Sequence, residues 1–148
     1  MINLSETKSF SCGKEAIFEI IEDIRKLGLI KKEMKNLSVA REEPGLQIVD
    51  TEMIFFPLKI RSRLQYTTRP ERYTELKQIK GLFKQYLCEY TITDTGLKSD
   101  LRISLKIKLP FFPLGFIISQ LYKPICKLRL YREFSVIGKM IKQQKGNV

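Results

Sequence analysis

The sequence predicts an α+β domain in which a curved antiparallel sheet of about seven strands wraps round one long C-terminal helix. Three observations lead to this prediction. The 148 residues suit a single domain, 1–148, with enough apolar content for a core. Strand-like patterns separated by turn signals fill residues 37–109. An apolar stretch that breaks at Pro110 to Pro113 then continues as a helix.

The first part of the chain predicts one strand and two short helices. Residues 2–11 set apolar side chains between polar ones, and Cys12-Gly13 ends this first strand. Residues 14–27 carry apolar side chains at helical spacing. Gly28 interrupts that pattern, so a second, short helix is expected at 29–34.

Six more strands are expected, at 37–42, 46–56, 58–68, 72–80, 82–93 and 101–109. Turns of a few residues join them, with signals such as Pro44-Gly45 and Asp94-Thr95-Gly96, so the strands form an antiparallel meander. Alternation along 58–68 indicates that one face of the sheet is apolar and covers the core.

The last element is a helix at 114–144, which is expected to supply the apolar side that the sheet covers. Pro124 is expected to kink this helix or to begin its second part. The residues expected to face the sheet are Ile117, Ile118, Leu121, Ile125, Leu128, Phe134, Ile137 and Ile141.

The order strand, two helices, six strands and long helix resembles the START-like superfamily, also called helix-grip or polyketide cyclase/dehydrase-like. Residues 15–24 are similar to the opening helix of its coenzyme-Q-binding and cyclase-like branches. Residues 80–86 resemble a Gly-Pro-Phe turn and aromatic strand of these branches, although Leu82 stands where proline is usual and Tyr86 where tryptophan is common. The resemblance covers nearly the whole chain. It implies an apolar ligand held between sheet and long helix, and it transfers no catalytic motif.

A few polar side chains among the inward aliphatic ones are what a ligand pocket needs to orient its ligand. They are also compatible with buried side chains that bond to the backbone or to water, which is the commoner arrangement. The predicted cavity lining comprises Ile60, Leu64, Tyr66, Leu76, Gln78, Tyr86, Cys88, Tyr90, Ile103, Leu105, Ile107, Ile118, Leu121 and Ile125.

Three turns that fall at one end of the meander are apolar and aromatic, whereas turns normally face water. They predict a cavity mouth or a membrane contact made by Phe55, Phe56, Leu82, Phe83, Phe111, Phe112 and Leu114. These side chains either plug the cavity, dip into a bilayer or contact a protein. Several lysines near the same end favour an anionic membrane surface as one partner.

The composition narrows the chemistry. The formal charge of +11 suggests an anionic partner or a solvated basic surface. The chain has no histidine, which removes the commonest general base and metal ligand, and neither a metal nor a cofactor is expected. Cys88 is expected to be an inert buried thiol, and Asp50 and Glu52 to be partners of a basic strand face. Three cysteines at unpatterned spacing favour a reducing cytoplasm.

The leading hypothesis is binding or transport of a hydrophobic small molecule, namely a lipid, an isoprenoid quinone or a polycyclic aromatic compound. Peripheral membrane docking is a further hypothesis that accompanies it. One alternative is a cyclase- or hydrolase-like enzyme that uses the same cavity. Another is a module that binds RNA, a ribosome or a protein through an outward basic strip of Arg61, Arg63 and Arg102. An enzyme is the less favoured class, because no catalytic constellation is present.

Overall fold

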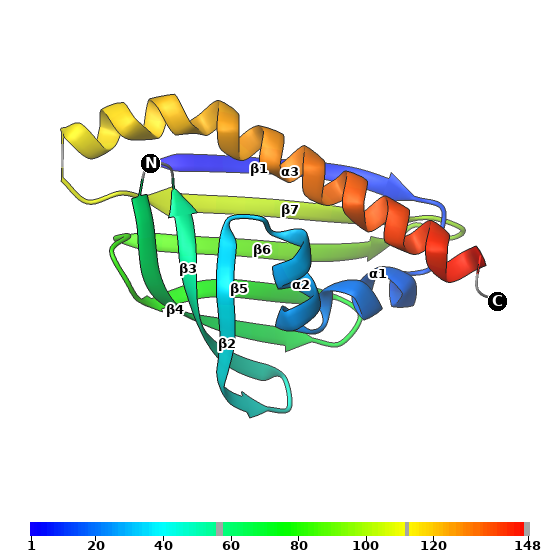
Figure 1. Ribbon diagram of the computed structural model, residues 1–148. Coiled ribbons are helices and arrows are strands. Elements are labelled where there is room, and N and C mark those ends of the chain that lie inside the picture. Colours follow the sequence, from blue (N-terminus) through cyan, green and yellow to red (C-terminus); the bar gives the residue numbers. More distant parts are fainter. Residues whose placement is uncertain (56–57, 112, 147–148) are drawn as a thin grey trace.

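The computed structural model describes residues 1–55, 58–111 and 113–146 (Figure 1). Seven strands form one antiparallel sheet in the order β1-β7-β6-β5-β4-β3-β2, and the predicted α+β architecture is confirmed. The elements are β1 (Ile2–Phe10), α1 (Lys14–Ile21), α2 (Ile24–Ile30), β2 (Met34–Glu43), β3 (Leu46–Phe55), β4 (Leu58–Arg69), β5 (Tyr73–Lys80), β6 (Gln85–Asp94), β7 (Ser99–Lys108) and α3 (Leu114–Gly146).

Consecutive hairpins build the sheet from β2 to β7, and β1 completes it. β1 pairs with β7 along its whole length, from Ile2 opposite Ile107 to Phe10 opposite Ser99. The sheet is strongly curved, and α3 runs across it beside β1 and β7, while α1 and α2 lie next to the second half of α3 (Figure 1). The antiparallel order places the β3–β4, β5–β6 and β7–α3 connections at one end of the sheet.

The two short helices are divided at a different place from the one predicted. The break comes at Asp23, whose carboxylate accepts a hydrogen bond of 2.9 Å from the backbone nitrogen of Arg25 and thereby caps α2. Gly28 lies inside α2, where a Cβ atom would come within 3.1 Å of the Leu37 side chain. Met34, expected to end the second helix, begins β2 instead, where it pairs with Met53 on β3.

The prediction of which face of α3 meets the sheet is wrong for its first half. The buried positions there are Ser119, Cys126 and Leu130, and the same face continues through Glu133 and Ile137. The side chains predicted to face the sheet but exposed instead are Ile117, Leu121, Ile125 and Leu128. The larger aliphatic side chains of this half lie on the exposed face, whereas the buried face includes Ser119, so apolar spacing indicates the wrong side. The helix also continues through Pro124 rather than beginning there.

The inward face of the sheet is the one that alternation predicted. Ten of the residues predicted to line a cavity are buried: Ile60, Leu64, Tyr66, Leu76, Tyr86, Cys88, Tyr90, Ile103, Leu105 and Ile107. The Tyr66 hydroxyl donates to the backbone oxygen of Ile21, which fastens β4 to the end of α1. Gln78 is half-buried and donates a hydrogen bond of 2.7 Å to the backbone oxygen of Phe83. The Tyr66 hydroxyl and the Gln78 amide nitrogen therefore have structural partners, whereas Gln78 Oε1 is buried without a hydrogen bond to any described residue.

Candidate functional site

The space between α3 and the sheet is a cavity of ≈ 20 Å³, which is room for about one water molecule. Cys126, Leu130 and Glu133 border it from α3, and Phe55, Tyr86 and Ile107 from the sheet. Of the side chains predicted to line a cavity, Tyr86, Leu105 and Ile107 do so. A lipid, a quinone or a polycyclic compound fits here only if α3 or the surrounding side chains move apart.

A buried lysine occupies the centre of the core next to this cavity. Lys31, at the end of α2, is 1% exposed, and its Nζ lies 3.2 Å from both carboxylate oxygens of Glu133 on α3. It also lies 3.3 Å from Glu33 Oε1 and donates to the Tyr90 hydroxyl at 3.2 Å and to Cys88 Sγ at 3.6 Å. The Tyr90 hydroxyl in turn donates to Glu133 Oε1 at 2.6 Å. We call Lys31, Glu33, Cys88, Tyr90 and Glu133 the buried polar cluster.

The environment sets the protonation states of the buried polar cluster. Burial disfavours a charge on Lys31, but the ionisable groups around it, Cys88 and Glu133 foremost, outweigh burial and raise its pKa well above the usual range. Burial raises the pKa of Glu133, although Lys31 opposes this. Burial also acts on Glu33, but there Lys31 prevails and lowers the pKa. A charged Lys31 paired with an ionised Glu33 follows, with Glu133 as the carboxyl that holds a proton most readily.

The two thiols nearest the cavity are poor nucleophiles. Burial raises the pKa of Cys88 to about 11 and that of Cys126 to about 11. A thiol with such a pKa stays protonated at neutral pH, and only the thiolate attacks. The predicted inertness of Cys88 agrees with this environment.

Aromatic side chains close the cavity at the end where the apolar turns meet. The rings of Phe55 and Tyr122 stack at 4.1 Å between centroids. Phe83 meets Phe55 edge-on at 5.5 Å and lies 5.7 Å from the Tyr86 ring. We call Phe55, Phe83, Tyr86 and Tyr122 the aromatic cluster. Its members come from β3, the β5–β6 turn, β6 and α3, so it ties the long helix to the sheet.

The residues predicted to form a mouth or membrane contact separate into two groups. Phe55 and Phe83 are buried in the aromatic cluster, where they fill the end of the cavity. Leu82, Phe111 and Leu114 are exposed. Phe56 and Phe112 lie outside the described residues.

A hollow of ≈ 200 Å³ leads from the protein surface to the buried polar cluster. Glu33, Ile54, Arg129 and Glu133 border both this hollow and the cavity, so the two spaces are neighbours. Arg132 and Lys32 stand at the outer rim of the hollow and are exposed. Three basic side chains therefore flank the polar approach to the cavity.

The residues that sequence reasoning missed are the charged ones: Lys31, Glu33, Arg129 and Glu133. Charged side chains are rarely buried unless paired, so a core prediction passes over them. One signal was available in the sequence, because Glu133 is the single acidic residue between Leu114 and Gln144. It follows Cys126 and Leu130 at helical spacing, on the face that is buried.

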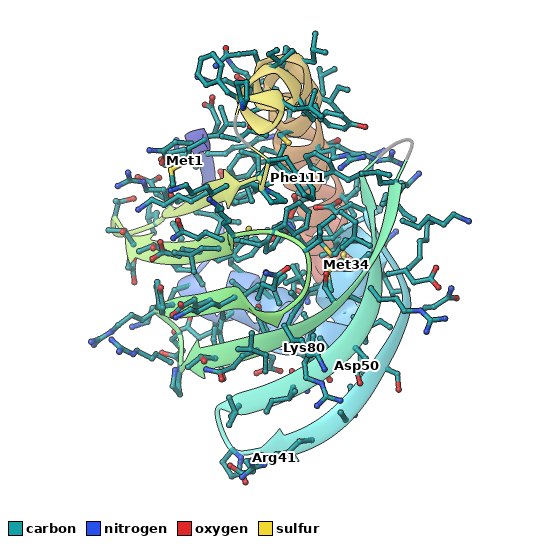
Figure 2. All side chains as sticks on the ribbon, turned by 90° about the vertical axis from the view of Figure 1, so that its left-hand side faces the viewer. Met1, Met34, Arg41, Asp50, Lys80 and Phe111 are labelled. Carbon is teal, nitrogen blue, oxygen red and sulfur yellow. The ribbon has the colours of Figure 1, made fainter. Side chains whose placement is uncertain are left out.

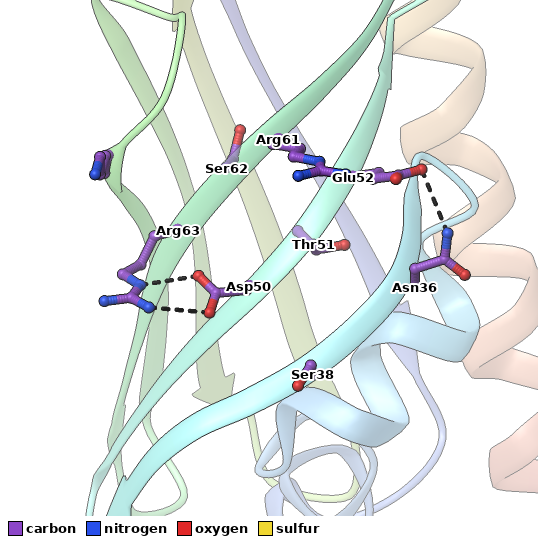
Figure 3. Close-up of a pocket in the computed structure, with 9 residues that line it drawn as sticks. Asn36, Ser38, Asp50, Thr51, Glu52, Arg61, Ser62 and Arg63 are labelled. Atoms are coloured by element: carbon purple, nitrogen blue, oxygen red, sulfur yellow. Dashed lines mark hydrogen bonds and ion pairs between the residues drawn. The ribbon is translucent and has the colours of Figure 1, made fainter.

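The outer face of the sheet carries a wider hollow of ≈ 500 Å³, in which both carboxylates already have partners (Figure 3). Arg63 donates from Nε and Nη2 to the two carboxylate oxygens of Asp50, at 2.8 and 3.0 Å, as predicted for a basic neighbour of that carboxylate. Asn36 donates to Glu52 at 3.3 Å. Of the predicted basic strip, Arg63 is therefore engaged by an acidic residue, and Arg102 donates to Ser5 at 2.8 Å. This weakens the alternative of a nucleic-acid surface.

No family model matches the sequence, and a search of characterised proteins finds no match. Solved structures match almost end to end. A protein from Thermus thermophilus superposes with a TM-score of 0.81 at 13% identity, covering 96% of this chain and 98% of that one. The Zhui aromatase/cyclase from a Streptomyces species gives 0.81 at 8% identity over 96% and 94%. A START superfamily protein from Mycobacterium smegmatis gives 0.73 at 16% identity over 96% and 98%. At these identities the likeness establishes the fold alone.

Proposed function

Because the chain has the START-like, helix-grip fold, we propose that it binds a hydrophobic small molecule between the sheet and α3. The observation that supports this most directly is that the cavity has an aromatic end and a polar end. Aromatic rings close one end, and the buried polar cluster with its basic approach stands at the other. A site with an apolar body and a few polar groups at one end suits an elongated amphiphile.

The ligand class follows from the charges at the polar end. Arg129, Arg132 and Lys32 flank the hollow that opens beside the cavity. An acidic head group placed there is attracted by these cations, while Glu33 and Glu133 are already engaged by Lys31. We therefore expect a lipid or isoprenoid ligand with a carboxylate or phosphate head, whose apolar chain extends beneath α3 toward the aromatic cluster.

Ligand binding must widen the cavity, and the first half of α3 is the element that can move. The second half is held by the buried side chains Phe134, Ile137 and Ile141 and by Glu133. The first half contributes mainly Ser119, Cys126 and the stacked Tyr122 to the interior. Lifting this half separates the Phe55–Tyr122 pair and joins the cavity to solvent at the aromatic end.

The test is a binding assay with palmitic acid and hexadecanol, which share a chain and differ in the head group. Displacement of a dansyl-labelled fatty acid measures the affinity of the protein for each of the two compounds. We expect saturable one-to-one binding, with palmitic acid at least about tenfold tighter than hexadecanol because of the charged head. Arg132→Gln should remove that preference. Arg102→Gln, an exposed arginine on the outer face of β7, is the matched control and should leave it intact.

Two results would contradict the proposal. Failure of both probes to bind saturably would refute hydrophobic ligand binding. Equal affinity for acid and alcohol, unaffected by Arg132→Gln, would refute the acidic head group.

A further inference from the structure

The outer face of the first half of α3 is apolar and faces solvent. Leu121 is 69% exposed and Leu128 is 68% exposed, and their neighbours on this face are exposed as well. We call the set the outer stripe; it consists of Leu114, Ile117, Leu121, Ile125 and Leu128. Steps of three or four residues separate its members, so they form one row about 21 Å long.

The outer stripe points away from the body of the protein. At 100° per residue it lies opposite the buried positions Cys126 and Leu130. The row becomes polar after Leu128, because the next positions on the same face are Arg132, Ser135 and Lys139, all exposed. The apolar part of the outer face is thus confined to the portion of α3 whose first turns extend past the ends of β1 and β7 (Figure 1).

Other exposed apolar side chains gather at the same end of the molecule. Figure 2 looks onto this end and shows Met1 and Phe111 beneath the first turns of α3. Phe111 and Phe116 are both more than half exposed, as is Leu58 at the start of β4. Exposed apolar side chains in one region mark an interaction site more often than scattered ones do.

The charges on α3 select the partner. Between Leu114 and Gln144 the helix carries six basic residues and one acidic residue, Glu133, which is 2% exposed. Arg132 and Lys139 follow the outer stripe on the same face of the helix and are exposed. A second copy of the chain would bring the same apolar row and the same basic continuation against itself, because a symmetric interface uses the same surface patch of both subunits. An anionic lipid surface suits both the apolar row and the basic residues that follow it on the same face.

We propose that the outer stripe docks the protein on an anionic membrane surface, with α3 lying in the plane of the head groups. The inference deepens the proposed function, because the helix that would lie on lipid is the one that covers the cavity. It does not require a bound ligand, since the outer stripe is exposed in the structure as it stands. It also places the contact on α3 rather than on Phe55 and Phe83, which are buried.

The experiment is co-sedimentation of the full chain with vesicles of phosphatidylcholine and phosphatidylglycerol, compared with pure phosphatidylcholine. We expect binding to the anionic vesicles that weakens as salt is raised from about 0.1 M to about 0.5 M. Leu121→Asp combined with Leu128→Asp should weaken it at least about tenfold, because both carboxylates would have to enter an anionic, apolar interface. Leu97→Asp is the matched control: Leu97 is 95% exposed in the β6–β7 turn, at the other end of the sheet, and its replacement should change nothing.

Three outcomes would overturn the proposal. Wild-type protein that stays in the supernatant with anionic vesicles is one. Equal binding of the double variant and the wild type is another. The third is a dimer in sedimentation analysis that the double variant dissociates, without vesicle binding by the wild type, which would make a second copy the partner.

The docking and the ligand proposals fail separately. Palmitic acid is titrated without vesicles, and vesicle binding is measured on protein freed of ligand. If one of the two assays fails to show binding, the proposal tested by the other assay is unaffected.

Discussion

Replacing Lys31 with methionine should remove the charge on which the buried polar cluster depends. In the wild type, Lys31 Nζ lies within 3.3 Å of a carboxylate oxygen on both Glu33 and Glu133. Methionine fills similar space without a charge, so Glu133 would be left buried beside a neutral thioether. Glu33 is affected less, because Arg129 also lowers its pKa.

The expected loss follows from the cost of an unpaired buried charge. Removing one partner of a buried ion pair lowers the free energy of unfolding by about 3–5 kcal/mol. For a chain of this length each kcal/mol lowers the melting temperature by about 2–4 °C, so a drop of roughly 10 °C is expected at neutral pH. Circular dichroism during heating and urea titration measures both quantities; the chain has no tryptophan to follow by fluorescence.

The pH dependence separates this explanation from a simple packing defect. Without Lys31 the pKa of Glu133 rises further, because that cation opposes the effect of burial. The folded variant then keeps a proton on Glu133 at pH values where the unfolded chain, near its ordinary value of 4.5, releases it. The unfolded state binds fewer protons, so the free energy of unfolding falls as pH rises. The loss in the free energy of unfolding of Lys31→Met relative to wild type should therefore be smallest near pH ~5 and grow toward pH ~8.

A double substitution completes the test. Glu133→Gln in the Lys31→Met background keeps an acceptor for the Tyr90 hydroxyl and removes the unpaired charge, so it should restore about 2 kcal/mol or more at neutral pH. A deficit that stays constant from pH 5 to pH 8, or a double variant no more stable than Lys31→Met, would refute the reasoning.

Three further results are expected. The Glu133→Gln variant should become more stable relative to wild type as pH rises from 4.5. The raised pKa of Glu133 makes the contribution of this carboxyl to the free energy of unfolding fall over that range, whereas glutamine does not titrate. Urea titrations across pH measure this, and a constant difference between variant and wild type would contradict it. Palmitic acid should speed the labelling of Cys126 by a thiol reagent and leave Cys88 protected, because of these two thiols only Cys126 lies on α3. Mass spectrometry of the labelled peptides measures both rates. If Cys126 stays as protected as Cys88 when palmitic acid is present, α3 does not lift. Phe83→Ala should cost about 3–5 kcal/mol, whereas Leu82→Ala, at an exposed neighbouring position, should change stability by less than about 1 kcal/mol; similar losses would contradict the role of Phe83 in the aromatic cluster.

The sheet could be predicted because its signal is repeated in every strand. Alternation along β4, β6 and β7 assigned the inward side chains correctly, and Tyr86, Leu105 and Ile107 were placed at the cavity from that pattern alone. The turn signals fixed the order of the hairpins, and hence the end at which the aromatic side chains meet.

The helices were harder, for two physical reasons. Apolar spacing continues across the break at Asp23, so its capping role was hidden in a pattern that looked like one helix. On α3 the apolar side chains of the first half face outward, whereas the buried face includes Ser119 and Glu133. A prediction that places the largest apolar residues inside therefore chose the wrong side. The buried polar cluster was missed for the same reason, since Lys31 and Glu133 satisfy each other only in three dimensions.

The pairing of β1 with β7 also sets the order in which the fold can form. Ile2 finds its partner Ile107 only after most of the chain has been synthesised, and Lys31 meets Glu133 later still. A growing chain can close the hairpins from β2 to β6 as they emerge, but β1 and α2 must wait for β7 and α3. Contacts so distant in sequence fold slowly. A fragment truncated before α3 would carry a lysine in its interior without the Glu133 carboxylate, and early termination should yield an aggregation-prone sheet rather than a smaller stable domain.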